Sequence, residues 1–91
     1  MPKINRISWA TSFKRAFKKH IIGTPEEHVF RQKLEAFLDN PFAPALRTHK
    51  LTGTLSGLWA FSAGYDCRVV FDFISSSEVL LIDIGPHDEI Y

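Results

Sequence analysis

Apolar side chains near the start of the chain first alternate and then recur at helical spacing. Ile7 and Trp9 lie on one side of an extended segment, which predicts a strand within residues 3–10. The apolar positions that follow keep the spacing of one helix face: Phe13, Ala16, Phe17, His20 and Ile21. Thr11 and Ser12 precede this face, and their hydroxyls can accept hydrogen bonds from the first N–H groups of a helix. We therefore expect a strand followed directly by an amphipathic helix.

A second helix is predicted by a strong start signal. Thr24-Pro-Glu-Glu27 places a capping threonine before a proline at the first helical position and a glutamate at the third. The buried stripe is expected at Val29, Phe30, Leu34, Phe37 and Leu38. Asp39-Asn-Pro41 then ends the helix. The two helices are expected to form a hairpin that buries its apolar stripes against a sheet or against each other.

The rest of the chain predicts strands. Residues 40–57 are expected to form a long connection, and loops of this length are often functional. Three apolar runs separated by tight turns follow, at residues 58–63, 66–74 and 79–84. This order predicts an α+β fold: an N-terminal strand, a two-helix hairpin and three antiparallel strands, in one mixed sheet of about four strands with the helices on one face.

Length and composition limit the possible classes of protein. A chain of 91 residues forms one domain, here residues 1–91, and 45% hydrophobic residues is ordinary for a folded protein. No run approaches the roughly 18 apolar residues that span a bilayer, and the start lacks the apolar stretch of a signal peptide, so we expect a cytoplasmic protein. The single cysteine, Cys67, can form neither an internal disulfide nor a thiolate zinc site. The histidine spacing is not that of a zinc site and no glycine-rich phosphate loop is present, so we expect no metal and no cofactor.

Charge is divided unevenly along the chain. Residues 1–55 hold ten basic and four acidic residues, whereas residues 56–91 hold one basic and six acidic residues. The predicted first helix carries basic side chains opposite its apolar face: Lys14, Arg15, Lys18 and Lys19. A shared basic face steers a protein toward a polyanion such as RNA. The alternative is a solvated helix surface without a ligand.

Four polar residues of the C-terminal half are candidates for chemistry. In the strand at residues 66–74, Arg68 and Asp72 alternate with the apolar positions and therefore share the solvent-facing side, roughly 13 Å apart. His49 lies in the long connection, and His87 follows the last strand in Gly85-Pro-His-Asp. The alternative for each is an ordinary exposed residue. His20 and His28 lie on a helix stripe and in a first helical turn, so we assign them no chemistry.

Ordered motifs along nearly the whole chain resemble the RelE/YafQ-type toxins of type II toxin–antitoxin systems. The motifs are His49-Lys-Leu-Thr-Gly53, Leu58-Trp59, Tyr65-Asp-Cys-Arg-Val-Val-Phe-Asp-Phe73 and Leu81-Ile-Asp-Ile-Gly-Pro-His-Asp-Glu-Ile-Tyr91. The lysine-rich segment Ile7–Lys19 also resembles the first strand and helix of that family. This resemblance implies the RelE-like fold.

The resemblance also implies site residues. The catalytic set is His49, Arg68, Asp72, His87 and Tyr91, and the RNA-binding set is Lys14, Arg15, Lys18, Lys19, Arg47 and Lys50. Arg68 would stabilise charge, His87 would act as general acid, His49 or Asp72 as general base, and Tyr91 would stack on or orient a base. One position departs from the YafQ pattern: Arg68 stands where YafQ-like members carry a second strand histidine, and it matches RelE- and YoeB-like members instead.

The activity that the resemblance implies is ribosome-dependent cleavage of mRNA. The RNA 2′-hydroxyl would attack the adjacent phosphate in the ribosomal A site, without a metal, and leave a 5′-hydroxyl fragment. The implied partners are a cognate antitoxin and the ribosome with its mRNA, with no membrane and no small-molecule cofactor. Two alternatives remain open: a ParE-like toxin that binds a protein target such as gyrase, or has lost activity, and an RNA-binding module without catalysis.

Overall fold

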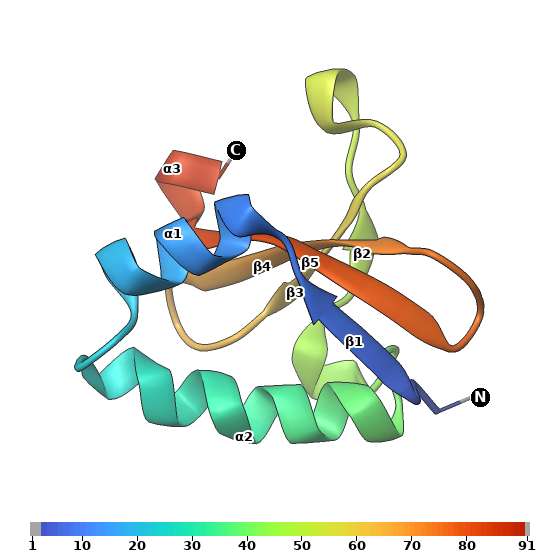
Figure 1. The fold of residues 1–91 in the computed structure, drawn as a ribbon, viewed down its shortest axis with the longest axis horizontal. Helices are drawn as coiled ribbons and strands as arrows, with labels where there is room; N and C mark the ends of the chain where they lie inside the picture. The colour runs from blue at the N-terminus through green and yellow to red at the C-terminus, as the bar shows by residue number, and fades with distance from the viewer. Residues whose placement is uncertain (1–2, 91) are drawn as a thin grey trace.

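The computed structural model describes residues 3–90 and shows a mixed sheet with two helices on one face (Figure 1). The strands are β1 (Arg6–Trp9), β2 (His49–Lys50), β3 (Trp59–Ser62), β4 (Cys67–Phe73) and β5 (Glu78–Pro86). The helices are α1 (Thr11–His20), α2 (Pro25–Asp39) and the short α3 (His87–Ile90), with 3-10 turns η1 (Pro44–Leu46) and η2 (Gly53–Leu55). The predicted α+β class and the order of its elements are confirmed. Within residues 3–90, no helix has both the length and the apolar character needed to cross a membrane.

The strand order is β1-β5-β4-β3-β2, with β1 parallel to β5 and the other neighbours antiparallel. The described residues thus form a five-stranded sheet, whereas the sequence predicts about four strands. The additional strand is β2, in which His49 and Lys50 pair with Ala60 and Trp59. A strand of two residues leaves no alternating pattern by which it could be recognised.

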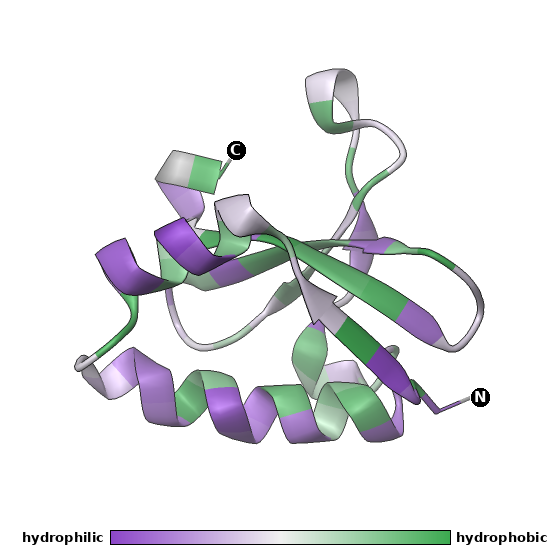
Figure 2. Ribbon diagram, viewed as in Figure 1, coloured by the Kyte–Doolittle hydropathy of each residue, from purple (hydrophilic) through white to green (hydrophobic). Residues whose placement is uncertain are grey.

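The main core fills the space between the sheet and helices α1 and α2. Aromatic side chains with at most 6% exposure dominate it: Phe13, Phe17, Phe30, Phe37, Phe61 and Phe71. Trp9 joins β1 to this core, because its ring lies 4.8 Å from that of Phe13 and 5.2 Å from that of Phe17. Hydrophobic segments follow the strands, and polar ones interrupt α2 on its outer side (Figure 2).

The caps of both long helices differ from the prediction. Ser12 does not cap α1, because its hydroxyl donates instead to the Ile82 carbonyl of β5 at 2.6 Å. Thr24 precedes α2, but its hydroxyl donates backward to the Ile21 carbonyl at 2.6 Å. Glu27 accepts a hydrogen bond from the Gly23 N–H at 3.0 Å, one residue earlier than in a capping box. These bonds tie α1 to β5 and fix the turn between the helices.

The opposite side of the sheet, here called the open face, carries a smaller apolar cluster. Its buried members are Leu51, Ala60 and Val70, and Leu55, Leu58, Ile82 and Ile90 pack against them. The register of β4 and β5 shifts between Val70 and Phe71, which pair with Asp83 and Leu81 and so leave Ile82 as the extra residue of a β-bulge. The bulge therefore brings Asp83 opposite Val70 on the open face.

Candidate active site on the open face

Arg68 is half-buried on the open face, in register with Ser62 of β3 and Gly85 of β5. Its Nη1 donates to the Ser62 hydroxyl at 3.3 Å and to the Cys67 carbonyl at 3.1 Å. These contacts hold the guanidinium group against β3 and β4. In the described part of the chain no ion pair joins Arg68 to a carboxylate of its own strand region. The guanidinium is thus positioned by neutral groups.

His87 begins α3 immediately after β5 and is exposed. Its backbone N–H donates to the Asp66 carboxylate at 3.3 Å, which fixes the start of α3 beside the first residues of β4. Arg68 pairs with Gly85, which lies two residues before His87 in the chain. The structure therefore brings Arg68 and His87 together at one end of the open face.

His49 is positioned by the connection that leads from α2 into the sheet. Thr48 donates a hydrogen bond to the Pro41 carbonyl, and Leu46 is fully buried, so this connection is anchored at both points. Arg47 adopts the left-handed conformation, with φ 52°, and its carbonyl contacts Nδ1 of His49 at 2.9 Å. A carbonyl can only accept a hydrogen bond, so Nδ1 of His49 is the donor in this contact.

A cavity of about 440 Å³ connects His49 with the C-terminal helix. The residues from His49 to Leu55 form one of its walls, and Ile90 of α3 lies on another. His87 and Ile90 belong to the same helical turn. The short helix α3 thus links the end of the open face that holds Arg68 and His87 to the cavity at His49.

Asp72 lies apart from this group. It pairs with Leu80 near the opposite end of β4. Six residues of extended chain separate it from Asp66, about 20 Å by the rise of a strand, and Asp66 is the residue that holds His87. Tyr91, the expected terminal aromatic, lies outside the described residues.

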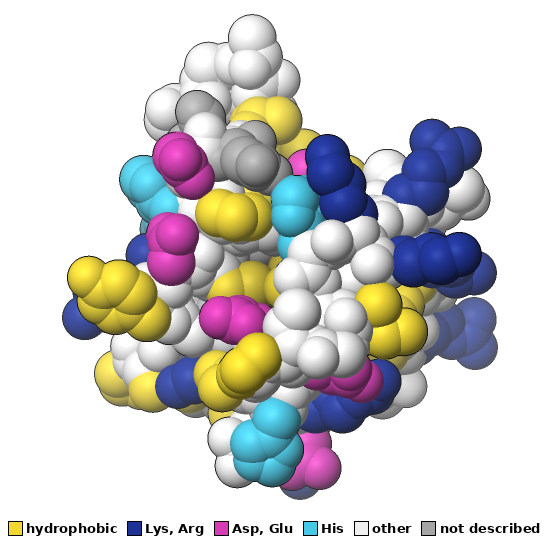
Figure 3. Space-filling view, turned by 90° about the vertical axis from the view of Figure 1, so that its left-hand side faces the viewer, with side chains coloured by type: hydrophobic (Ala, Val, Ile, Leu, Met, Phe, Trp, Pro, Cys, Tyr) yellow, Lys and Arg dark blue, Asp and Glu magenta, His cyan; other side chains and the backbone are white. Residues whose placement is uncertain are grey.

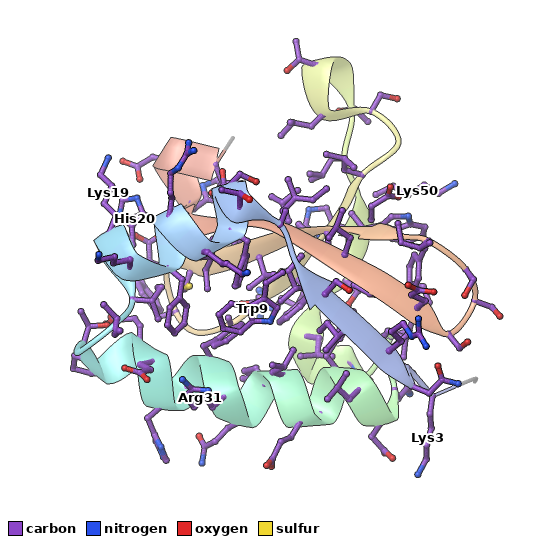
Figure 4. The ribbon with its side chains drawn as sticks, in the orientation of Figure 1. Lys3, Trp9, Lys19, His20, Arg31 and Lys50 are labelled. Carbon is purple, nitrogen blue, oxygen red and sulfur yellow. The ribbon has the colours of Figure 1, made fainter. Side chains whose placement is uncertain are left out.

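The expected RNA-binding residues form two separate groups. All six are exposed: Lys14, Arg15, Lys18, Lys19, Arg47 and Lys50. Basic side chains gather along one side of the face shown in Figure 3. Figure 4 places Lys19 at one end of the molecule and Lys50 at the other, where Lys50 Nζ lies 5.4 Å from the centre of the Trp59 ring. A ligand that contacts both groups must therefore extend across the molecule.

Three residues that the sequence did not single out lie close to the candidate site. Ser62 holds Arg68, and Asp83 shares the open face because of the bulge. His20 approaches from α1: a methyl group at Gly85 would lie 3.4 Å from the His20 ring. Ser62 is the single polar residue of β3, which could have indicated it, whereas a bulge and a helix–strand contact leave no local pattern.

A second, smaller cavity of about 210 Å³ lies beside His20 and Gly85. Asp66, Glu26 and Cys67 line it as well. Burial raises the pKa of the Cys67 thiol to about 11, and the nearby carboxylates of Glu26 and Asp66 act in the same direction. Among the described residues, no three His, Cys, Asp or Glu side chains are arranged to hold a metal ion.

Solved structures with the same architecture include several toxins. A copper-bound variant toxin from Helicobacter pylori matches with a TM-score of 0.71 at 21% identity, over 94% of this chain and 98% of its own. A YoeB/ParE toxin from Agrobacterium tumefaciens matches with a TM-score of 0.71 at 17% identity, over 90% of this chain and 98% of its own. A chain of the E. coli DinJ–YafQ toxin–antitoxin complex matches with a TM-score of 0.66 at 17% identity, over 97% of this chain and 99% of its own. The chain has the RelE-like toxin fold.

The RelE-like fold expected from the sequence motifs is thereby confirmed over nearly the whole chain. No protein-family model and no curated protein sequence matches the chain. Identities of 21% or less establish shared architecture, and the chemistry of the site must be argued from the residues of this chain.

Proposed function

We propose that the chain is the toxin of a type II toxin–antitoxin system and acts as a ribosome-dependent mRNA endonuclease in the cytoplasm. The observation that carries the proposal is the arrangement of Arg68, His87 and His49 around α3 on the open face of a RelE-like fold. An arginine and two histidines supply charge stabilisation, an acid and a base, which are the groups that RNA cleavage by its own 2′-hydroxyl requires.

In the proposed reaction the 2′-oxygen forms a bond to phosphorus and the bond from phosphorus to the 5′-oxygen breaks. His49 accepts the proton of the 2′-hydroxyl on Nε2, since its Nδ1 is held as a donor by the Arg47 carbonyl. His87 donates a proton to the leaving 5′-oxygen, and Arg68 stabilises the negative charge on the phosphate oxygens. The products are a 2′,3′-cyclic phosphate and a 5′-hydroxyl end.

Of the two expected bases we assign the role to His49, because the cavity that it lines also contacts Ile90 of α3, the helix that begins at His87. Asp72 lies about 20 Å along the chain of β4 from Asp66, the residue that holds His87.

The partner that we propose is an antitoxin, as in the E. coli toxin–antitoxin complex. An acidic, largely disordered segment that wraps the helix hairpin or covers the open face would pair with the basic residues of α1, and apolar anchors would accompany the charge pairs. Purification from the native operon should give a small co-eluting protein in a complex that salt weakens only partly. A toxin that elutes alone at low salt would contradict this partner.

A ParE-like action on a protein target is the second candidate, because a YoeB/ParE toxin shares the fold. Expression without the antitoxin separates the two. Our proposal expects growth arrest with an early block of protein synthesis and unchanged DNA supercoiling. Blocked supercoiling with intact mRNA would contradict the nuclease and favour the second candidate.

A further inference from the structure

The 440 Å³ cavity beside His49 falls in the size range of small-ligand sites, about 300–1,000 Å³. The proposed cleavage step uses only His49 of the residues that line it. The remaining walls combine apolar surface with hydroxyl groups: Leu51, Leu55 and Ile90 supply the first, and Thr52 and Thr54 the second. This composition suits a flat ligand with polar edges.

We propose that this cavity binds one unpaired nucleobase of the RNA, next to the phosphate that is cleaved. Proteins recognise unpaired bases by packing apolar or aromatic side chains on the ring faces and by hydrogen bonds at the base edges. Here Leu55 and Ile90 would contact the ring, and the threonine hydroxyls would bind its edge. The inference rests on the proposed function and names the part of the site that gives it sequence preference.

The wall of the cavity is formed by the fold before any ligand binds. In η2, the Ser56 N–H donates to the Gly53 carbonyl at 3.1 Å, and the Leu58 N–H donates to the Leu55 carbonyl at 3.1 Å. The Leu51 N–H then donates to the Leu58 carbonyl at 2.9 Å, which joins this turn to the start of β3. A preformed wall holds the hydroxyls at fixed positions, as discrimination between bases requires.

The charges around the cavity also favour a nucleotide. Its lining contains two basic residues, His49 and Lys50, and no acidic side chain among the described residues. A base in the cavity would carry its flanking phosphates past Lys50, whose positive charge stabilises them.

Matched valine variants test the inference. Thr52→Val and Thr54→Val each remove a hydroxyl at nearly constant volume, and Thr11→Val, at an exposed position in α1, is the control. Cleavage of programmed ribosomes that carry each of the four bases beside the cut should change its base preference by about five- to ten-fold in at least one cavity variant. The control should keep the wild-type preference. Unchanged preferences in both cavity variants, with cleavage intact, would overturn the inference.

A binding measurement separates this inference from the proposed function. A 2′-O-methyl trinucleotide cannot be cleaved by 2′-hydroxyl attack. The chemical-shift changes that it causes in the backbone amides of the protein therefore report binding alone. We expect shifts in residues 49–55 and at Ile90, with weaker binding in Leu55→Ala and unchanged binding in the exposed control Ile74→Ala. Shifts confined to other surfaces would overturn the cavity assignment. A wild-type protein that shows the expected shifts but cuts no mRNA would contradict the nuclease and leave the base site supported.

Discussion

Arg68 donates a hydrogen bond from Nη1 to the Ser62 hydroxyl on the neighbouring strand, at 3.3 Å. Neither Asp66, just before β4, nor Asp72 of the same strand forms an ion pair with Arg68 in the described part of the chain. Neutral partners position a guanidinium without neutralising it. This arrangement suits a group that must stabilise an anion.

Arg68→Ala should therefore lower the single-turnover cleavage rate by about 10²- to 10³-fold, as loss of a transition-state charge donor does in other enzymes. Arg68→Lys should keep binding but lose part of the rate, since an ammonium cannot hold two phosphate oxygens in a planar fork. The rates are measured on a programmed ribosome at saturating protein, with melting temperature alongside and Ser62→Ala as the milder variant. An alanine variant within a few-fold of wild type would remove Arg68 from the reaction.

Arg47 supplies a test of the loop that positions His49. With φ 52°, a side chain at this position is strained, and glycine is the residue that adopts the conformation without cost. Arg47→Gly should raise the free energy of unfolding by up to about 1 kcal/mol, whereas Arg47→Ala should not. Both variants lose the same charge, so their difference in urea denaturation reports the backbone alone. Equal stability of the two would contradict the assigned conformation.

Much of the fold followed from periodicity, because amphipathic helices and alternating strands bury one face each. The start of α2 at Pro25 and the alternation in β4 were both correct. The strand β2 was missed because two residues carry no period, and the bulge at Ile82 because an inserted residue is visible only through its partner strand.

The candidate site was less accessible to sequence reasoning. The order of the motifs singled out His49, Arg68 and His87. Histidine and arginine side chains can supply the acid, the base and the positive charge for RNA cleavage whatever the fold. The contacts that place them come from elsewhere: Ser62 on another strand, the Arg47 carbonyl, and Asp66, which is 21 residues from His87. The contact between Asp66 and His87 depends on the assembled sheet, and the contact between Arg47 and His49 depends on a left-handed residue, so the sequence pattern predicts neither.

Cys67 should react slowly with alkylating reagents in the folded protein. Burial raises its pKa from 9.0 to about 11, so near pH 8 the folded state holds about 100-fold less thiolate than the unfolded chain. Iodoacetamide labelling of native protein, compared with the urea-unfolded chain, measures the difference. The same shift predicts that stability falls between about pH 9 and 11, where only the unfolded thiol ionises. Equal labelling rates would show that the thiol is accessible and ionised.

Glu27 links α2 to the turn before it through a hydrogen bond from the Gly23 N–H, and it forms a 3.1 Å ion pair with Arg31 of the same helix. Both contacts lower the pKa of the Glu27 carboxyl, and the hydrogen bond from the Gly23 N–H has the larger effect. A lowered pKa in the folded state stabilises the protein above the ordinary value of 4.5, and the effect is lost as pH falls through the folded pKa. Glu27→Gln should thus lower the melting temperature at pH 7 and lose this effect in acid. Glu35→Gln, exposed on the same helix, is the control, and equal pH profiles of the two would count against the link.

His87→Ala tests the central claim most directly, because His87 is exposed and contributes little to packing. The measurement maps 5′ ends by primer extension in a reconstituted translation reaction, with wild-type protein and His87→Ala at saturating concentration. Wild-type protein should cut within codons of ribosome-bound message, and His87→Ala should cut about 10²- to 10⁴-fold more slowly at an unchanged melting temperature. Intact message with the folded wild-type protein, or full cutting by the variant, would contradict it.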